Sequence, residues 1–240
     1  MKLFKIFSIA FLCILCLSSY DSNPVGIWMI GDSTMAPKKK EAFPELGWGV
    51  ALSDFVTNKA TVHNHAINGR STLSFINSNS WKNVCDSLQP GDYVIIQFGH
   101  NDQKPKPDRH TEPFGSFTDN LKKFITETRS HKATPVLCSS IVRRHFDGKG
   151  NLLDTHGDYI TAVQQVANET KTAYVDMEKL TRKLVVNMGP EGSKSIFNFT
   201  DKKQDSTHLN INGAKVVAKL FVDDAINRKL PIAKFLDAKK

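Results

Sequence analysis

At 240 residues, with 40% apolar side chains, the chain is long enough for one α/β domain with a sizeable core. The formal net charge of +8 favours acidic partners, but no nucleic-acid-binding motif, basic helix or interleaving of aromatic and basic residues accompanies it, so we expect no nucleic-acid partner. Much of the positive excess lies in Lys38 to Lys40 and in the two terminal lysines, so charge alone selects no partner.

The first twenty residues, 1–20, form a separate segment. Two lysines precede an apolar run over residues 6–17, and two serines follow it. This order is typical of a secretory signal peptide, and the run is short for a membrane span. We therefore expect cleavage near residues 19–20, a single domain over residues 21–240, and a secreted or periplasmic protein.

Five apolar runs bounded by turn residues predict strands, and amphipathic stretches between them predict helices. Strands that alternate with helices, without internal repeats, form a parallel sheet covered on both faces, and right-handed crossovers bring the strand ends to one rim. We expect an α/β protein, a three-layer α/β/α sandwich around five parallel strands. The expected strands are 25–30, 61–67, 93–98, 134–141 and 173–177; the expected helices are 47–57, a short one capped by Ser71, 81–88, 116–131, 159–167, 178–188 and 212–226; and residues 189–200 are expected to form a loop.

The cysteines divide between the two segments. Cys13 and Cys16 leave with the signal peptide, and a lipid anchor at either is the less favoured alternative. Cys85 falls on an expected helix and Cys138 inside an expected strand. A disulfide between them is possible, but two separate free cysteines are favoured, because a buried free thiol on a strand is common.

The first strand ends abruptly at Gly31-Asp32-Ser33-Thr34-Met35. In open α/β sheets, ligands bind just beyond the carboxyl ends of the strands, so Ser33 is a candidate nucleophile. Asp and Ser are also ordinary turn and cap residues, so this stretch alone leaves both interpretations open.

A base for such a serine stands far away in the sequence. A serine hydroxyl needs a base to take its proton, and the base works best when a carboxylate fixes its tautomer. Asp205 and His208, three apart on a turn or first helical turn, could face the same way and meet Ser33. The alternative is a capping aspartate beside a surface histidine.

Two further strand ends supply hydrogen-bond donors. Acyl transfer places negative charge on the carbonyl oxygen, and preorganised N–H groups stabilise it. The side-chain amide of Asn101 and the backbone N–H groups of Gly69 and Ser33 could form this oxyanion hole. Gly69 suits the role because a residue without Cβ lets the backbone approach a ligand closely.

Four stretches in this order resemble the SGNH (GDSL-like) hydrolase superfamily: Gly31-Asp32-Ser33, Asn68-Gly69-Arg70, Gly99-His100-Asn101-Asp102 and Asp205-Ser206-Thr207-His208. The longer motifs GDSTM, AINGRS, FGHND and SIVRRHF look like the rhamnogalacturonan acetylesterase branch, carbohydrate esterase family 12. The resemblance covers about residues 25–228. It implies a flavodoxin-like fold and a serine esterase with Ser33, Asp205 and His208 as its triad and Ser33, Gly69 and Asn101 as its oxyanion donors.

Four residues are candidates for substrate binding. Arg143 and Arg144 follow the fourth expected strand, and a guanidinium binds a carboxylate bidentately, although a structural or solvated ion pair is the commoner fate of an arginine. Arg70, beside Gly69, is a third candidate. By the resemblance Trp48 lies near the substrate cleft, and the alternative is an aromatic ring that packs a helix on the sheet.

Other enzyme classes fit less well. Met35 stands where the α/β-hydrolase motif G-x-S-x-G requires glycine, and none of the eight histidines forms H-E-x-x-H, so we expect neither that fold, nor a metal, nor a cofactor. The favoured function is a monomeric, secreted serine esterase that removes acetyl groups from rhamnogalacturonan, an acidic pectic polysaccharide. The alternatives are an esterase for xylan or another acetylated glycan, or for a lipid ester, and a carbohydrate-binding protein without catalysis.

Overall fold

Five short apolar strands form one parallel sheet in the computed structural model, which describes residues 23–239. The strand order is β2-β1-β3-β4-β5, and every neighbouring pair is parallel. The five-stranded parallel sheet expected from the sequence is confirmed. The strands are β1 (Val25–Gly31), β2 (Ala60–Asn64), β3 (Tyr93–Gln97), β4 (Thr134–Cys138) and β5 (Ala173–Val175).

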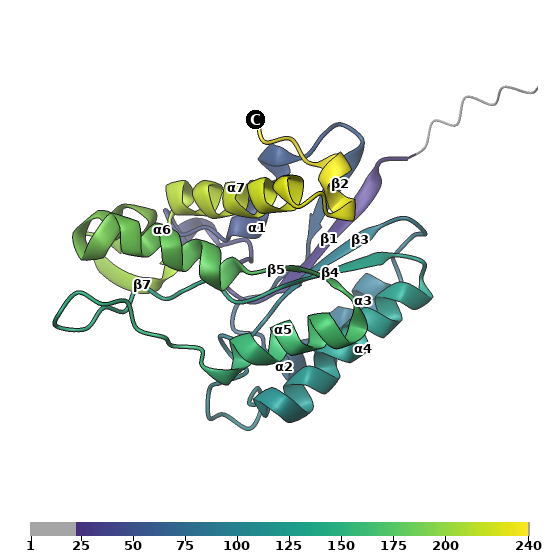
Figure 1. Ribbon diagram of the computed structural model, residues 1–240, viewed down its shortest axis with the longest axis horizontal. Coiled ribbons are helices and arrows are strands. Elements are labelled where there is room, and N and C mark those ends of the chain that lie inside the picture. The colour runs from purple at the N-terminus through teal and green to yellow at the C-terminus, as the bar shows by residue number, and fades with distance from the viewer. Residues whose placement is uncertain (1–22, 240) are drawn as a thin grey trace, which may run out of the picture.

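The side chains of each strand alternate between two cores, one on each face of the sheet. Along β1, Ile27 and Met29 enter one core, whereas Trp28 and Ile30 enter the other. Helices α1, α6 and α7 cover the first face and α2 to α5 cover the second, which confirms the three-layer α/β/α sandwich (Figure 1). The helices are α1 (Trp48–Ala51), α2 (Thr72–Asn77), α3 (Ser80–Cys85), α4 (Thr118–Ser130), α5 (Asp158–Thr170), α6 (Met177–Gly192) and α7 (Ile211–Asn227).

Side-chain caps fix the first turns of α2 and α7. Ser71 and Ser74 form a reciprocal capping box at the start of α2, as expected. Asn210 caps α7 by accepting a hydrogen bond from Gly213 N at 2.9 Å. A Cβ at position 213 would lie 1.8 Å from the carbonyl oxygen of Ile196, so only glycine permits this close packing.

The expectation of a loop over residues 189–200 is wrong. Helix α6 continues to Gly192 past a kink at Gly189, whose φ of 69° is left-handed, and at Pro190. Two antiparallel strands follow, β6 (Phe197–Thr200) and β7 (Lys203–Leu209). β6 has only four residues, and β7 is polar except for Leu209, so neither forms an apolar run of the kind by which strands are recognised in a sequence.

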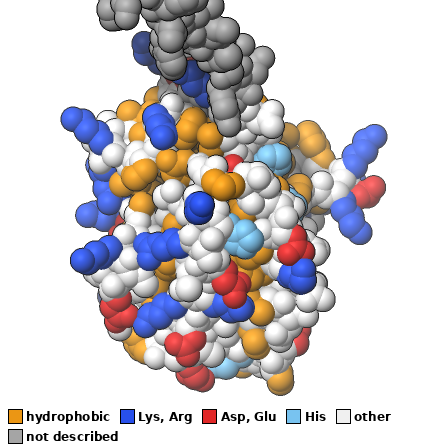
Figure 2. Space-filling view, turned by 90° about the vertical axis from the view of Figure 1, so that its right-hand side faces the viewer, with side chains coloured by type: hydrophobic (Ala, Val, Ile, Leu, Met, Phe, Trp, Pro, Cys, Tyr) orange, Lys and Arg blue, Asp and Glu red, His pale blue; other side chains and the backbone are white. Residues whose placement is uncertain are grey.

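The structure also bears on the expectations about the cysteines and about membrane spans, but only for the residues that it describes. Cys85 and Cys138 are free thiols, as favoured. Among residues 23–239, no helix is both long and apolar enough to cross a bilayer. The predicted signal peptide, its cleavage site and the two cysteines within it lie outside the described residues. At the amino ends of the strands, the molecular face shows lysine and arginine side chains interspersed with acidic ones (Figure 2).

Trp48 belongs to the core and does not line a cleft. Its side chain is 0% exposed, and its ring lies 5.5 Å from that of Phe221 on α7. The indole N–H donates to Gln97 Oε1 at 2.8 Å, and Gln97 in turn donates to Thr34 Oγ1 at 2.7 Å. The family-based expectation of a cleft residue is therefore wrong, and the alternative of an aromatic that packs helix on sheet is correct.

Replacing Trp48 with phenylalanine leaves Gln97 Oε1 buried without its donor. An unsatisfied buried acceptor costs about 1–3 kcal/mol, so the free energy of unfolding in urea should fall by about that amount while KM stays within about two-fold. Trp81→Phe is the matched control, because Trp81 donates to Glu127, which Lys123 also neutralises. A large rise in KM without loss of stability in the Trp48 variant would contradict the core assignment.

Candidate active site

Ser33 lies on the tight turn that follows β1, the second strand of the sheet. Asp32 is fully buried, and its Oδ1 accepts hydrogen bonds from Thr34 N at 2.9 Å and Thr34 Oγ1 at 2.8 Å. Burial raises the pKa of Asp32, and these bonds from Thr34 oppose the rise. The turn therefore has a fixed shape and leaves the half-buried Ser33 side chain at the rim.

The structure brings Ser33, His208 and Asp205 together. Ser33 Oγ lies 2.9 Å from His208 Nε2, and His208 Nδ1 lies 2.8 Å from Asp205 Oδ2. A carboxylate beside Nδ1 favours the tautomer with its proton on that nitrogen, so Nε2 is left to accept the serine proton. This arrangement has the geometry of a nucleophile, a base and an orienting carboxylate.

A bulge in β7 makes this geometry possible. On a regular strand, residues three apart point to opposite faces, so Asp205 and His208 would not meet. In the hairpin, Asn198 pairs with Asp205 and Phe197 pairs with Leu209, which leaves residues 206–208 as an insertion in β7. Within this insertion, Asp205 Oδ1 accepts the N–H groups of residues 207 and 208. The expected turn or first helical turn is thus a bulged strand.

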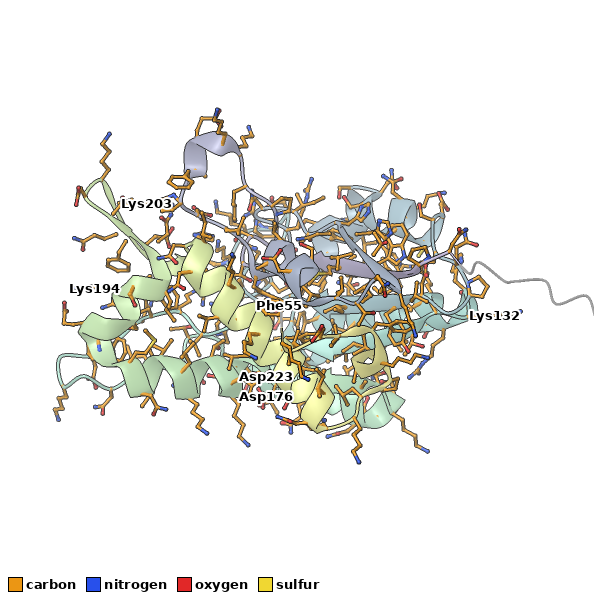
Figure 3. The ribbon with its side chains drawn as sticks, turned by 90° about the horizontal axis from the view of Figure 1, so that it is seen from above. Phe55, Lys132, Asp176, Lys194, Lys203 and Asp223 are labelled. Atoms are coloured by element: carbon orange, nitrogen blue, oxygen red, sulfur yellow. The ribbon has the colours of Figure 1, made fainter. Side chains whose placement is uncertain are left out.

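Hydrogen bonds keep the carboxylate of Asp205 ionised. Burial on its own would raise the pKa of Asp205, but donors from the side chain and backbone of His208, from Lys203 and from Thr207 N hold it well below its usual range. Lys203 Nζ lies 2.9 Å from Asp205 Oδ2. Figure 3 places Lys203 at the end of the molecule opposite Lys132, which precedes β4, so this group lies beyond the carboxyl ends of the strands.

The turns that carry Gly69 and Asn101 are tied together. Asn101 is buried, and its Nδ2 donates to Arg70 O at 3.0 Å while its Oδ1 accepts from Lys104 Nζ at 2.9 Å. Gly69 has a φ of 77°, a left-handed value that favours glycine. An amide carries two N–H groups, so Asn101 retains one donor beside the turn of Gly69.

Arg143 is a buried structural residue next to the site. The prediction that it binds substrate is therefore wrong. It is 8% exposed, and its guanidinium donates to His100 O at 3.2 Å and to Thr155 O at 3.1 Å. His100 Nδ1 and His156 Nε2 share a hydrogen bond of 2.9 Å. Burial, followed by the charge of Arg143, lowers the pKa of His156 to about 3, so this layer holds neutral histidines.

The other two candidate arginines, Arg144 and Arg70, differ in how fully their guanidinium groups are paired. Arg144 Nε donates to Ser193 Oγ at 3.1 Å, its Nη2 donates to Pro190 O, and its guanidinium lies 4.7 Å from the centroid of the Phe199 ring. It therefore holds the end of α6 against the hairpin. Arg70 is half-buried in a shallow surface pocket with Asp108, and its Nε has no partner among the described residues.

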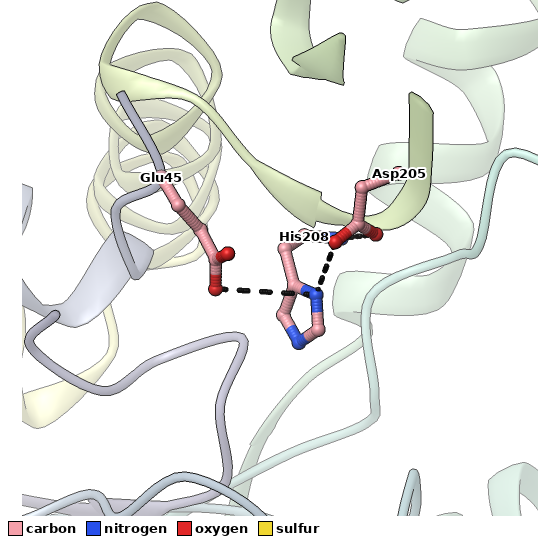
Figure 4. Close-up of side chains that lie close together, drawn as sticks. All are labelled: Glu45, Asp205 and His208. Carbon is pink, nitrogen blue, oxygen red and sulfur yellow. Dashed lines mark hydrogen bonds and ion pairs between the residues drawn. The ribbon is translucent and has the colours of Figure 1, made fainter. Parts of the chain in front are cut away.

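Three charged residues of the site, Lys38, Glu45 and Lys203, were not predicted. Glu45 Oε1 lies 2.9 Å from Lys38 Nζ and 3.9 Å from His208 Nδ1, and Oε2 lies 3.0 Å from Lys203 Nζ. Figure 4 shows Glu45 and Asp205 on two sides of the imidazole, with the second ring nitrogen turned away from both. A lysine within a run of three is typical of a solvated surface, so residue type gave no signal.

Glu45, Asp205 and His208 also offer ligand atoms within 4.8 Å of one another, a spacing that a metal ion could use. However, the ammonium groups of Lys38 and Lys203 already lie 2.9–3.0 Å from the carboxylate oxygens. Two cations in this position neutralise the carboxylates and disfavour a third. The cluster is therefore better described as an ion-paired network around His208.

Comparison with known families assigns this geometry to a family. The model of the GDSL-like lipase/acylhydrolase family matches residues 29–216. The chain belongs to this family. It has the SGNH hydrolase fold and resembles the rhamnogalacturonan acetylesterase branch expected from the motifs, and its membership identifies it as a carboxylic ester hydrolase.

Relatives of this GDSL-like hydrolase include two from the bacterium Bacillus subtilis and one from a fungus. Rhamnogalacturonan acetylesterase RhgT of B. subtilis is 34% identical over 88% of the chain and 93% of its own length. Rhamnogalacturonan acetylesterase of Emericella nidulans is 27% identical over 82% of each. Among solved structures, the B. subtilis protein YxiM superposes with a TM-score of 0.78 at 24% identity, over 88% of this chain and 58% of that one.

His156→Gln tests the neutral histidine layer. In the unfolded chain this histidine has a pKa near 6.5, whereas the folded protein holds the pKa at about 3, so acid protonates the unfolded state first and lowers stability. Glutamine keeps a hydrogen-bonding side chain but does not titrate. Between pH 7 and pH 5 the wild type should lose roughly 2 kcal/mol more unfolding free energy than the variant.

Urea unfolding at both pH values measures this difference. His110→Gln is the control, because it removes an exposed histidine that lies outside this buried layer. An equal pH dependence in wild type and His156→Gln would mean that the folded protein protonates His156 as readily as the unfolded chain does.

Proposed function

We propose that this hydrolase removes acetyl groups from rhamnogalacturonan, an acidic pectic polysaccharide, through an acyl-enzyme on Ser33. The observation that supports it is the 2.9 Å contact between Ser33 Oγ and His208 Nε2, with Asp205 on the other ring nitrogen. The signal-like segment at residues 1–20 supports a secreted or periplasmic location, where such a polymer is met.

In the first half of the reaction, Ser33 Oγ attacks the acetyl carbonyl carbon and His208 Nε2 takes the serine proton. Asp205 stabilises the resulting imidazolium. The N–H groups of Ser33 and Gly69 and the amide of Asn101 are the proposed donors to the oxyanion. Collapse of the tetrahedral intermediate breaks the bond to the sugar oxygen, which leaves as a hydroxyl with the proton from His208.

In the second half, water attacks the acetyl-serine. His208 accepts a proton from the water and gives it to Ser33 Oγ as the second tetrahedral intermediate collapses, which restores the Ser33 hydroxyl and releases acetic acid. A carbohydrate-binding protein without catalysis would not need a hydroxyl, an imidazole and a carboxylate aligned within hydrogen-bonding distance. The geometry therefore favours the enzyme over that alternative.

Sequence similarity favours rhamnogalacturonan over xylan or lipid. Two relatives named rhamnogalacturonan acetylesterase are 34% and 27% identical to this chain. A catalytic mutant of Axe2, an acetylxylan esterase from Geobacillus stearothermophilus, superposes with a TM-score of 0.62 at 18% identity, over 84% of this chain and 94% of that one, and supports only the fold.

A surface pocket of about 560 Å³ beside the site fits an acidic sugar chain. Lys38 and Glu45 lie on the wall that it shares with the site, and Lys39 and Lys40 are exposed and without side-chain partners among residues 23–239. Phe43, 74% exposed, contributes an apolar surface. Unpaired ammonium groups attract carboxylates, and an aromatic face packs against the apolar face of a sugar. Arg70 remains a further candidate.

Ser33→Ala should reduce turnover of 4-nitrophenyl acetate by at least about 10³-fold, because the nucleophile is lost while the donors remain. Acetate release from acetylated rhamnogalacturonan should fall in parallel, and the wild type should release acetate from acetylated xylan, and fatty acid from a lipid ester, more slowly. Undiminished turnover in the alanine variant would remove Ser33 from the mechanism, and a preference for xylan or lipid would replace the proposed substrate.

A Lys39→Ala/Lys40→Ala double variant tests the acidic substrate. Loss of two partly solvated charges should raise KM for acetylated rhamnogalacturonan roughly 3- to 10-fold and weaken its salt dependence, whereas kcat on 4-nitrophenyl acetate stays constant. The matched control is Lys59→Ala/Lys82→Ala, which removes the same number of charges from the residue before β2 and from α3, neither of which lines the pocket. Equal KM values in the two double variants would exclude these lysines from substrate binding.

A further inference from the structure

Lys38 differs from the two lysines that follow it. Its side chain is 5% exposed, whereas Lys39 and Lys40 are exposed. The ammonium group has three acceptors: Ser33 O at 2.5 Å, Asn68 Oδ1 at 2.7 Å and Glu45 Oε1 at 2.9 Å. An ammonium carries three N–H donors, so all of them are used.

We propose that Lys38 is a positioning residue, whose ammonium group locks the turn of the nucleophile to the turn of the oxyanion hole. The proposal rests on the function proposed for Ser33, Gly69 and Asn101. It adds a cation that touches none of the reacting atoms and acts through the backbone that carries them.

The first step of the argument concerns the two turns that Lys38 joins. Ser33 follows β1, and Asn68, which immediately precedes Gly69, lies on the loop after β2. The backbone bond from Ile67 N to Gly31 O at 3.0 Å and the side chain of Asn64, which donates to Met35 O and accepts from Ala66 N, also join these segments. The ammonium of Lys38, however, bonds directly to Ser33 and to Asn68, the residue before Gly69. Oxyanion donors lower a barrier only when they are fixed before the reaction, so a clamp between these turns acts directly on the rate.

The second step concerns what fixes Lys38. Glu45 has a side chain that is 9% exposed, and it accepts hydrogen bonds from Lys203 Nζ at 3.0 Å and from Asn198 Nδ2 at 3.2 Å as well as pairing with Lys38. The isolated bridge between Glu45 and Asn210 anchors its backbone beside the cap of α7. A buried ammonium with one ion pair and two further acceptors is held in a single position.

The third step concerns charge. The ammonium of Lys38 lies on the nucleophile side of the site, and negative charge develops there only in the tetrahedral intermediates. Glu45 balances the charge of this ammonium, so Lys38 acts through the two N–H groups that fix Ser33 O and Asn68 Oδ1. These bonds hold the donors that stabilise the intermediate, so the effect falls on kcat and not on KM. The two carboxylates, Glu45 and Asp205, lie on the side of His208, where the positive imidazolium develops.

Lys38→Met removes the ammonium and keeps most of the apolar stem. We expect kcat on 4-nitrophenyl acetate to fall about 10- to 100-fold, less than the 10²- to 10³-fold loss of a direct oxyanion donor, with KM within about three-fold. Affinity for phenylboronic acid, which forms a tetrahedral adduct with a reactive serine, should fall by a similar factor. Lys59→Met is the control, because Lys59 is an exposed lysine at the amino edge of β2.

Chemical rescue separates positioning from folding. Lys38→Cys treated with 2-bromoethylamine forms a thioether, as the cysteine sulfur displaces bromide, and this places an ammonium at nearly the reach of lysine. Recovery of kcat without a change in the melting temperature supports positioning. Wild type treated in the same way controls for reaction at Cys85, which is half-buried and free.

Two results would overturn the proposal. One is a Lys38→Met variant whose kcat and boronate affinity match those of Lys59→Met; the other is a loss of kcat that follows the melting temperature and is not rescued. If Lys38→Met does not fold, Asn68→Ala keeps the test open, because Asn68 is exposed and its removal frees the oxyanion turn from the clamp. Ser33→Ala, measured alongside, distinguishes failure of this proposal from failure of the esterase mechanism itself.

Discussion

The contact between Ser33 Oγ and His208 Nε2 joins residues 175 positions apart, and much of the fold serves to hold it. Ser33 is fixed by β1 in the interior of the sheet, whereas His208 belongs to a hairpin outside the sheet. The hairpin is held from the other side by the cap of α7 at Asn210 and by the ion pairs of Glu45. A hydroxyl and an imidazole react only at hydrogen-bonding distance, so the sheet and the hairpin must keep one relative position.

A layer of buried polar side chains lies next to the active-site turns. Asp32, His100 and Asp102 are almost fully buried, and each retains one side-chain atom without a partner among the described residues. Burial raises the pKa of Asp102 to about 7 and lowers the pKa of His100, so both tend toward their neutral forms. Neutral groups in a low dielectric cost less than ions, yet incompletely satisfied groups still lower stability. Active-site turns commonly carry such a cost.

Hydrophobic periodicity predicted the parallel sheet. The order of the motifs predicted which residues lie near one another at its carboxyl edge, because the carboxyl ends of parallel strands meet there and Ser, His and Asp have recognisable catalytic chemistry. The sequence did not predict which polar and aromatic side chains are buried, or how β7 pairs with β6. Trp48 lies at the start of an expected helix and Arg143 follows an expected strand, and exposed residues are also common at both kinds of position. Only the three-dimensional packing shows that both are buried. Lys38 lies in a run of lysines that predicts solvent exposure, and the bulge of β7 arises from pairing with β6, which no local pattern records.

The shared carboxylate of Glu45 means that the two halves of the site are not independent. Oε1 of Glu45 pairs with Lys38, which contacts the nucleophile turn, and lies 3.9 Å from His208 Nδ1. Oε2 pairs with Lys203, which also pairs with Asp205. Removal of any one ion leaves a neighbouring charge buried and unbalanced, so the partners reorganise together. Free energies of substitution on the two sides should therefore be non-additive. Orientation of the base and preorganisation of the oxyanion donors thus follow from one network of charges.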